Sequence, residues 1–234
     1  KDGMPICFGY FAVSFAFGIQ AAGIGLSVFE ASVLSALNVT SAGQFAALAI
    51  IASGASLIEL AFTQLIINLR YFLMSCALSQ RLSPSLPLGH RLGIAYGMTD
   101  EIFAVSVSQR EPLSPFYSYG LIAVAIPGWV LGTALGAAAG NILPAVLTNA
   151  LGIAIYGMFI AIILPPAKEN RVVAGVVVLS MVLSALFTYL PVLCNISSGF
   201  RIIVITLITA GGAALLFPIP DEPAEPEKEM PHES

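Results

Sequence analysis

The sequence predicts an all-α protein that crosses a membrane with about seven to eight helices. Of its 234 residues, 58% are hydrophobic and only 9% are charged, and the mean hydropathy is +0.93. Soluble domains carry roughly a quarter charged residues, so this chain lacks the polar residues that a water-facing surface needs. The apolar residues also gather into stretches of about 20, the length of a helix that crosses the hydrocarbon core of a bilayer.

The expected spans follow one another with short connections. They are 5–26, 31–53, 57–79, 89–108, 116–139, 143–164, 171–190 and 199–217. Connections this short leave no room for a separate soluble domain, so residues 1–217 are expected to form a single transmembrane domain. The remaining segment, 218–234, is rich in proline and acidic residues and is expected to be disordered.

Charge and motif content exclude several classes of function. The net charge of −4 arises in the tail, which holds six of the thirteen acidic residues, and the chain has no basic cluster of the kind that binds nucleic acid. No stretch matches GxxxxGK[ST], HExxH or GxSxG, so we expect neither ATP hydrolysis nor an enzyme. The three cysteines are far apart, at no spacing that suits a metal or a disulfide framework, and no cofactor is expected.

Three charged residues lie well inside the expected spans. Arg70 is near the middle of 57–79, and Asp100 and Glu101 lie past the middle of 89–108. Each such charge costs about 2.5–3.5 kcal/mol at a helix centre unless it finds a partner or water. We therefore expect Arg70 to pair with one carboxylate, which leaves the other free to titrate or to hold a substrate ammonium. The alternative is an ion pair that only fixes helix register.

Polar side chains recur along one face of span 57–79 at the helical spacing i, i+4, i+7 and i+11. They are Gln64, Asn68, Tyr71 and Ser75. Such a stripe serves either hydrogen bonding between helices or the wall of a hydrated pathway beside Arg70. Glu59 and Thr63 share a different stripe with Arg70, and Glu59 is too far along the helix to pair with it directly.

The connection after the first span, residues 27–44, interrupts an apolar run with polar residues and glycines. A broken or re-entrant segment survives at membrane depth only where it is buried in protein or lines a cavity. Ser41, with Gln44 three residues later, has the sequence of a helix N-cap. If a helix begins here within the membrane, the N–H groups of residues 41–44, which include Gly43, would suit a substrate carboxylate. The alternative is an ordinary loop near the membrane surface.

Glycines at i+4 spacing mark two further helices. Gly93 and Gly97 form a GxxxG motif in span 89–108, where they either let a partner backbone approach closely or mark a break. A longer stripe in span 116–139 and just beyond predicts tight helix contact, within the chain or with another subunit. Its members are Gly128, Gly132, Gly136 and Gly140. A shift of 109–110 residues superimposes glycines of 5–26 and 116–139 and indicates a weak internal duplication.

Four blocks of sequence stand out between residues 8 and 165. They are Gly25-Leu26-Ser27, Ala42-Gly43-Gln44-Phe45, Asn68-Leu69-Arg70-Tyr71-Phe72-Leu73 and Thr99-Asp100-Glu101-Ile102-Phe103-Ala104. In order and spacing these blocks resemble the AzlC family of bacterial branched-chain amino acid exporters. The marked positions of the family that this chain preserves are Gln44, Asn68, Arg70, Asp100 and Glu101.

The resemblance implies a multi-pass protein of the bacterial cytoplasmic (inner) membrane. It implies export of leucine, isoleucine, valine and methionine, driven by the proton-motive force rather than by ATP. It also implies a small hydrophobic partner subunit of the AzlD type. The acidic tail, 218–234, departs from the family pattern.

The residues and the resemblance together give one hypothesis. The expected substrate-binding residues are Ser41, Gly43, Gln44, Phe45, Asn68, Arg70 and Tyr71, and the expected proton-coupling residues are Asp100 and Glu101. Phe15, Phe45 and Tyr71 would receive the aliphatic side chain. Because one methylene is worth only about 1–3 kcal/mol of discrimination, several related substrates are expected rather than one.

The expected partners are the amino acid substrate, protons, an AzlD-like small membrane subunit and the lipid bilayer, with no nucleic acid among them. Two other functions stay open on the sequence. One is a non-transporting membrane subunit or scaffold that assembles with a small hydrophobic partner. The other is a channel for small polar solutes.

Overall fold

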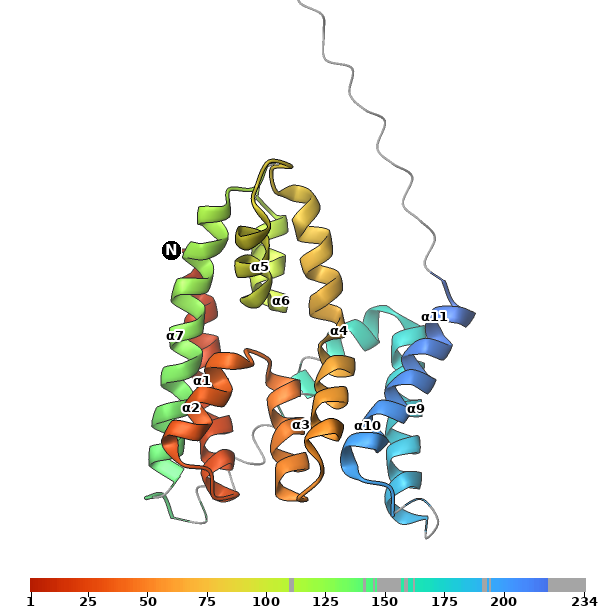
Figure 1. Cartoon of the computed structure of the whole chain (residues 1–234). Coiled ribbons are helices and arrows are strands. Elements are labelled where there is room, and N and C mark those ends of the chain that lie inside the picture. The colour runs from red at the N-terminus through yellow and green to blue at the C-terminus, as the bar shows by residue number, and fades with distance from the viewer. Residues whose placement is uncertain are drawn as a thin grey trace, which may run out of the picture.

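The protein is a bundle of helices (Figure 1). The computed structural model describes residues 1–109, 112–140, 142–144, 146, 157, 160–161, 163–190, 193 and 195–218. No strand occurs among these residues. The expected span 143–164 lies largely outside the described residues, and the tail from residue 219 lies wholly outside them.

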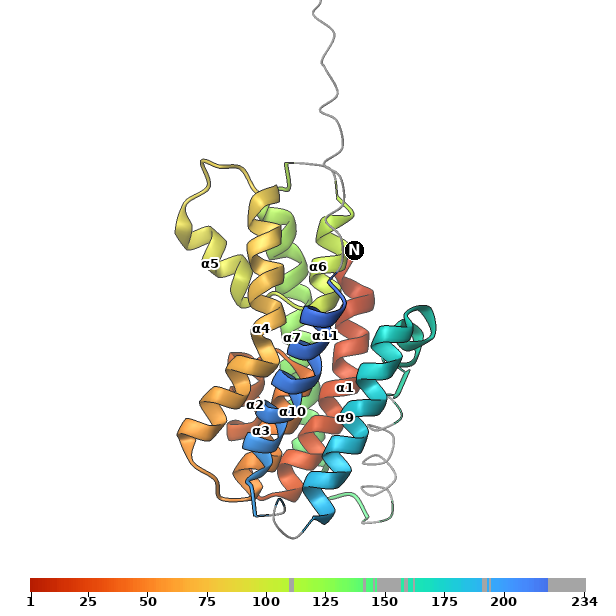
Figure 2. The same ribbon diagram turned by 90° about the vertical axis from the view of Figure 1, so that its right-hand side faces the viewer.

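Within the described residues, five helices are long and apolar enough to cross a membrane. They are α1 (Gly3–Gly23), α4 (Leu57–Arg81), α7 (Pro115–Gly140), α9 (Arg171–Tyr189) and the continuous stretch Ser198–Leu216. That last stretch comprises α10 (Ser198–Thr206), the π-helical turn η1 (Leu207–Gly211) and α11 (Gly212–Leu216). Figure 2 shows α9 beside the α10–α11 stretch, and α10 packs against α4. The predicted multi-span helical fold is confirmed.

Two of the expected spans are pairs of half-length helices instead. Span 31–53 divides at residues 38–40, and span 89–108 divides at residues 97–99. The halves are α2 (Val28–Leu37) with α3 (Ser41–Ala52), and α5 (Leu88–Tyr96) with α6 (Asp100–Val107). Each pair turns back midway through the molecule, the first in the lower half of Figure 1 and the second in the upper half. The re-entrant segment predicted around 27–44 is therefore confirmed, and the single spans expected at 31–53 and 89–108 were wrong.

The helices from α1 to α6 form two units of the same order, each a long helix followed by a re-entrant hairpin. In Figure 1 α1 runs downward and its hairpin rises from below, whereas α4 runs upward and its hairpin descends from above. The units are therefore inverted relative to each other. A shift of 59 residues carries Thr40, the N-cap of α3, onto Thr99, the N-cap of α6, so this repeat has a shorter period than 109–110. The two tips touch, because the Tyr96 hydroxyl donates to the Ala36 carbonyl.

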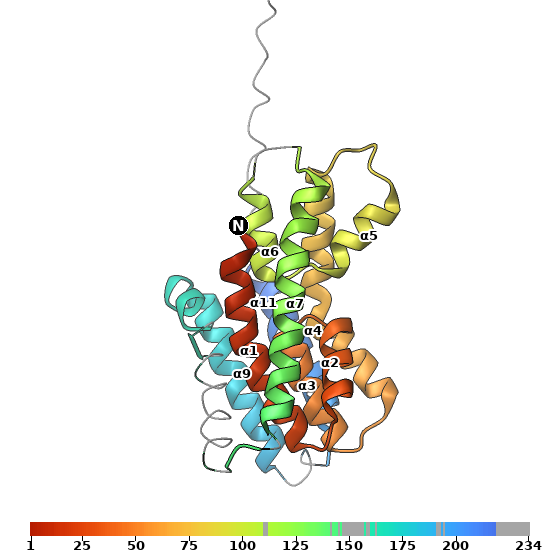
Figure 3. The ribbon, with the colours of Figure 1, turned by 90° about the vertical axis from the view of Figure 1, so that its left-hand side faces the viewer.

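The glycine motifs explain how closely the helices pack. In Figure 3, α1 and α7 run side by side along one face of the molecule. A methyl group added at Gly132 of α7 would lie 2.5 Å from the Phe11 carbonyl oxygen of α1, so the stripe finds its partner within the chain. A methyl group at Gly97 would lie 2.6 Å from the side chain of Ile122 on α7. Gly97 also ends α5, so this motif combines close packing with a helix break.

Candidate functional site

The tips of the two hairpins border a cavity of about 530 Å³. Small-molecule sites commonly have volumes of about 300–1,000 Å³, so the cavity is large enough for a small ligand. Its polar lining consists of Tyr10, Thr40, Ser41, Arg70, Tyr71, Thr99, Asp100, Glu101 and Thr206. Its apolar lining consists of Val13, Val39, Ala42, Ile66, Ile67, Trp129 and Ile163.

The N-terminus of α3 forms one wall of the cavity. Thr40 has an extended backbone, with φ −148° and ψ 120°, and its hydroxyl accepts a hydrogen bond from the Gly43 amide at 3.4 Å. Thr40 is therefore the N-cap, and the expectation that Ser41 holds this role was wrong by one residue. Ser41 and Ala42 form the first turn and line the cavity. The amides of a first turn have no acceptor within their own helix, and the helix dipole makes this end favourable for an anion.

The N-terminus of α6 forms another part of the cavity wall, with acidic residues in its first turn. Thr99 is the N-cap, and its hydroxyl accepts from the Ile102 amide at 3.4 Å. Asp100 and Glu101 follow it and both line the cavity. The positive end of the helix dipole stabilises carboxylates at this position, which helps to hold two acids next to each other.

Arg70 of α4 pairs with one of these acids. Its Nη2 atom lies 2.8 Å from Oδ2 of Asp100, which matches the pairing expected from the sequence. The side chains are 48% and 40% exposed, so the pair faces the cavity rather than packing dry between helices. Arg70 also donates to the Tyr71 hydroxyl at 2.8 Å, and its guanidinium carbon lies 4.7 Å from the centroid of the Tyr71 ring.

Glu101 has a different partner. The Tyr10 hydroxyl of α1 donates to Oε2 of Glu101 at 2.7 Å and lies 2.5 Å from the Thr99 hydroxyl. Tyr71 of α4 interacts with Thr40, so each unit contributes a tyrosine to the N-cap of the other unit's hairpin. The two acids are therefore held separately, one by a cation and one by a neutral hydroxyl.

Two of the predicted binding residues lie outside the cavity lining. Gln44 is wholly buried, accepts from Nε1 of Trp129 at 3.0 Å and donates to Ser35 at 2.9 Å. It therefore ties α3 to α2 and α7. The Phe45 ring packs edge-on against Phe17, with ring centroids 5.6 Å apart. Neither side chain has the position of a direct substrate contact.

Gly43 and Asn68 also lie outside the lining, in a hydrogen-bond network centred on Gln64. Gln64 donates to the Gly43 carbonyl at 2.8 Å and accepts from Asn38 at 3.0 Å and from Asn68 at 3.2 Å. This part of the polar stripe therefore joins α4 to the α2–α3 hairpin. Only its upper part, at Tyr71 beside Arg70, reaches the cavity. Phe15, expected against the aliphatic side chain, is also absent from the lining described in the structure.

Four important cavity residues were not predicted. Thr40 and Thr99 could have been found, since each is a threonine that precedes a short apolar helical run. Trp129 carries the chain's single indole N–H, which needs a partner when buried. Tyr10 gives no local signal, because its partner lies 91 residues away in the sequence. Among the described residues, no three His, Cys, Asp or Glu side chains converge as a metal site.

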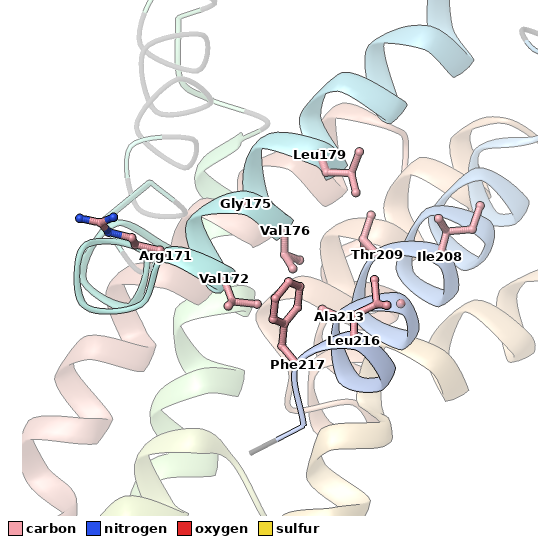
Figure 4. Close-up of a pocket in the computed structure, with 11 residues that line it drawn as sticks. Arg171, Val172, Gly175, Val176, Leu179, Ile208, Thr209, Ala213, Leu216 and Phe217 are labelled. Atoms are coloured by element: carbon pink, nitrogen blue, oxygen red, sulfur yellow. The ribbon is translucent and has the colours of Figure 1, made fainter. Parts of the chain in front are cut away.

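A second cavity, of about 460 Å³, lies between α9 and the α10–α11 stretch (Figure 4). Its lining is almost entirely apolar, with Val172, Val176 and Leu179 on one side and Leu216 and Phe217 on the other. Arg171 points away from the other labelled side chains in Figure 4. Among the described residues of α9, only Phe187 is buried. This surface thus suits lipid or another helix rather than a polar ligand.

The inverted units and the charged central cavity define a multi-pass membrane transport protein. Residues 5–143 match the family described as AzlC protein, and the chain belongs to this family. It is 36% identical over 174 residues to an uncharacterized membrane protein of Archaeoglobus fulgidus, which covers 74% of this chain and 76% of that protein. It is 32% identical over 179 residues to inner membrane protein YgaZ of Escherichia coli K12, which covers 73% of each chain. The protein is a multi-pass protein of the inner membrane. No solved structure matches the chain.

Proposed function

We propose that the protein is a secondary transporter that exports leucine, isoleucine, valine and methionine in exchange for protons. One observation carries the proposal. A neutral helix N-terminus, at Ser41, and an acidic one, at Asp100, border the same cavity beside Arg70. Half-helices whose N-termini meet an anionic substrate group are a recurring device of secondary transporters.

The two tips suit the two ends of an amino acid zwitterion. The substrate carboxylate is assigned to the amides of Ser41 and Ala42 and to Arg70, since these carry positive charge or its equivalent at a helix N-terminus. The ammonium group is assigned to Asp100 and Glu101. Both ends of the ligand would then exchange water for charge-assisted hydrogen bonds, which are the stronger ones in proteins.

The apolar lining suits an aliphatic side chain. Val13, Val39, Ile66 and Ile67 offer aliphatic contacts, and Trp129 adds an aromatic surface. A smooth apolar wall separates ligands by about 1–3 kcal/mol per methylene, so we expect a group of branched and unbranched aliphatic amino acids as substrates.

Proton coupling is assigned to the Arg70–Asp100 pair. A proton that binds Oδ2 of Asp100 neutralises the carboxylate, so Asp100 no longer holds the substrate ammonium and the substrate is released. Loss of that proton restores the carboxylate and with it the site for the ammonium group. A proton and the substrate ammonium cannot both occupy Asp100, which links the movement of the one to the other.

The experiment is counterflow of labelled leucine in proteoliposomes, with and without a pH gradient. We expect saturable exchange that responds to the gradient in the unmodified protein, and exchange without that response in Asp100→Asn. Glu101→Gln is the matched comparison, because its acid is held by Tyr10 rather than by Arg70. Absence of saturable exchange would indicate a scaffold subunit, and flux without trans-stimulation would indicate a channel. If both variants still respond to the pH gradient as the unmodified protein does, neither acid takes part in coupling.

We also propose that a small AzlD-like membrane subunit binds the α9–α11 surface. The low burial of α9 and the apolar cavity of Figure 4 support this assignment. Co-expression with a tagged companion, followed by purification in detergent, tests it. Val176→Trp, which fills the cavity, should prevent co-purification, whereas Leu131→Trp on the exposed face of α7 should leave it intact. Equal recovery with both variants would place the companion elsewhere.

A further inference from the structure

A second polar cluster lies where α10 begins against α4. Glu59 is only 5% exposed, and its Oε1 atom accepts a hydrogen bond from the Gly199 amide at 2.8 Å. Ser197, the N-cap of α10, makes no capping bond of its own, so Glu59 supplies the acceptor from the neighbouring helix. The carboxylate is roughly 16 Å from Arg70 along α4, at 1.5 Å per residue. It is therefore a buried acid that the central cavity does not use.

Unpaired hydroxyl groups accompany this carboxylate. Those of Thr63, Ser197 and Ser198 are buried and have no hydrogen-bond partner within the described part of the chain. Thr63 is wholly buried, and its hydroxyl lies with the Glu59 carboxylate beside Gly199. A methyl group added at Gly199 would lie 2.5 Å from Oε1 of Glu59 and 2.7 Å from the Thr63 hydroxyl. Buried hydroxyls in native proteins are satisfied by protein or by water, so this cluster suits water beside the acid.

The cluster is aligned with the central cavity. In Figure 1, α4 and α10 run upward together from the lower end of the molecule. Ile66 and Ile67 of α4 and Thr206 of α10 line the cavity, and Thr63 lies about one helical turn, or 5 Å, below them. The seam between α4 and α10 therefore carries polar groups at both ends, with Thr63 beside Gly199 at the lower end and Thr206 beside the cavity.

Few charges face Glu59 from the elements around it. On α10 the nearest along the chain is Arg201, whose Nε donates to the Ile196 carbonyl at 2.8 Å. The α3 sequence contains no charged residue, and α9 contains only Arg171, at its start. The structure shows no ion pair to Glu59 among the described residues. The start of α10 and Arg201 are thus the positive charges nearest to this acid.

We propose that Glu59 is a proton-binding site and that the α4–α10 seam conducts protons between the lower end of the molecule and the Arg70–Asp100 pair. The inference rests on the proposed function, since it supplies the route of the coupling proton. The Glu59 carboxylate takes a proton from water at the lower end and gives it to water beside Thr63. A proton then passes from water to Asp100, which becomes a carboxylic acid, so that only O–H bonds form and break.

The first test is Glu59→Gln in proteoliposomes. Glutamine keeps an oxygen that can accept from Gly199, so the contact between α4 and α10 survives, but it cannot carry a proton. We expect leucine counterflow to persist. Leucine-driven proton uptake, followed with an internal pH dye, should fall by roughly tenfold or more, because a positioned acid–base group speeds proton transfer by at least that factor.

The matched control is Glu30→Gln. Glu30 lies at the same end of the molecule, is exposed and caps α2 through Ser27, a bond that glutamine can also make. Proton uptake should be unchanged in this variant. Equal loss of counterflow and proton uptake in Glu59→Gln would show a structural role and overturn the proposal, as would unchanged proton uptake. Absence of counterflow in the unmodified protein would instead count against the proposed function.

A second measurement does not depend on transport at all. In a chain whose three native cysteines are replaced by serine, Thr63→Cys should react with a small water-soluble methanethiosulfonate reagent, because the seam is hydrated. Leu78→Cys is the control, since it lies on the same helix, is 1% exposed and belongs to an apolar cluster. A Thr63→Cys thiol as unreactive as the control would mean a dry seam and would overturn the proposal.

Discussion

The two re-entrant hairpins share a backbone and differ in chemistry. Each consists of a first half-helix, a short tip and a second half-helix that begins at a capping threonine, Thr40 or Thr99. The residues that follow are Ser41 and Ala42 in one hairpin and Asp100 and Glu101 in the other. The same geometric device therefore presents a neutral helix start on one side of the cavity and two acids on the other.

The difference teaches how an inverted repeat can serve an asymmetric ligand. Two identical tips would both favour an anion, because a bare helix N-terminus carries partial positive charge. Two carboxylates in the first turn of α6 reverse that preference, while α3 keeps it. Arg70 balances one of the acids, so the cavity holds both signs of charge. A zwitterion fits such a pair of tips better than a simple anion or cation does.

The largest effect should come from removing the cation between the tips. Arg70→Ala leaves Asp100 unpaired and removes a contact to the substrate carboxylate. A hydrogen bond to a charged group contributes about 1.5–3 kcal/mol, so we expect a roughly 10- to 100-fold loss of kcat/KM for leucine. Because the pair is about half exposed, protein stability should change by about 1 kcal/mol or less.

Proteoliposome uptake and thermal unfolding in detergent measure the two effects separately. The double variant Arg70→Ala, Asp100→Ala should unfold at the temperature of the unmodified protein and remain inactive. If Arg70→Ala fails to insert or express while the double variant inserts normally, the ion pair has a structural role. The different charges of the two hairpin tips would then be no evidence for a zwitterion site.

A smaller effect should follow from making the neutral tip acidic. Ser41→Asp gives α3 the residue that α6 has after its cap, and it repels the substrate carboxylate. A favourable interaction of an anion with a helix N-terminus is worth up to about 2 kcal/mol, so its loss should raise the KM by about tenfold. The same aspartate should leave stability unchanged or raise it by about 0.3–1 kcal/mol.

Ser41→Asn is the control for this variant, since it has the same shape without the charge. Its KM should stay close to that of the unmodified protein. Equal KM values for Ser41→Asp and Ser41→Asn would show that the α3 tip does not receive a carboxylate, and the ligand assignment would have to be reversed or abandoned.

The sequence predicts the membrane class, the pairing of Arg70 with one of the two acids and the re-entrant segment near 27–44. It does not predict the second hairpin, because two half-helices joined by a short tip have the length and hydropathy of one span. Gly97 and Thr99 are the only local signs of that break, and a GxxxG motif has another explanation in helix packing.

Long-range partners account for the remaining differences. Gln44 and Asn68 look like cavity residues in the sequence, but the Gln44 amide accepts from Trp129 of α7 and the Asn68 amide donates to Gln64 within α4. Tyr10 meets Glu101 only because α1 packs beside α6. A buried amide takes whichever partner the packing brings within reach, and the spacing of residues along one helix does not contain that information.

The smallest effect compares the residues just before the two caps. Val39 lines the cavity, whereas Met98 is packed in an apolar cluster with Leu78 and Ile94. Val39→Ala should widen the cavity and favour larger substrates. A buried methylene is worth about 0.8 kcal/mol, so the ratio of leucine to valine transport should rise by about fourfold. Met98→Ala should lower stability by about 2–5 kcal/mol and leave that ratio unchanged. Competition between the two labelled amino acids in one preparation measures the ratio independently of expression. An equal shift in both variants would mean that selectivity follows overall packing rather than the residue that faces the ligand.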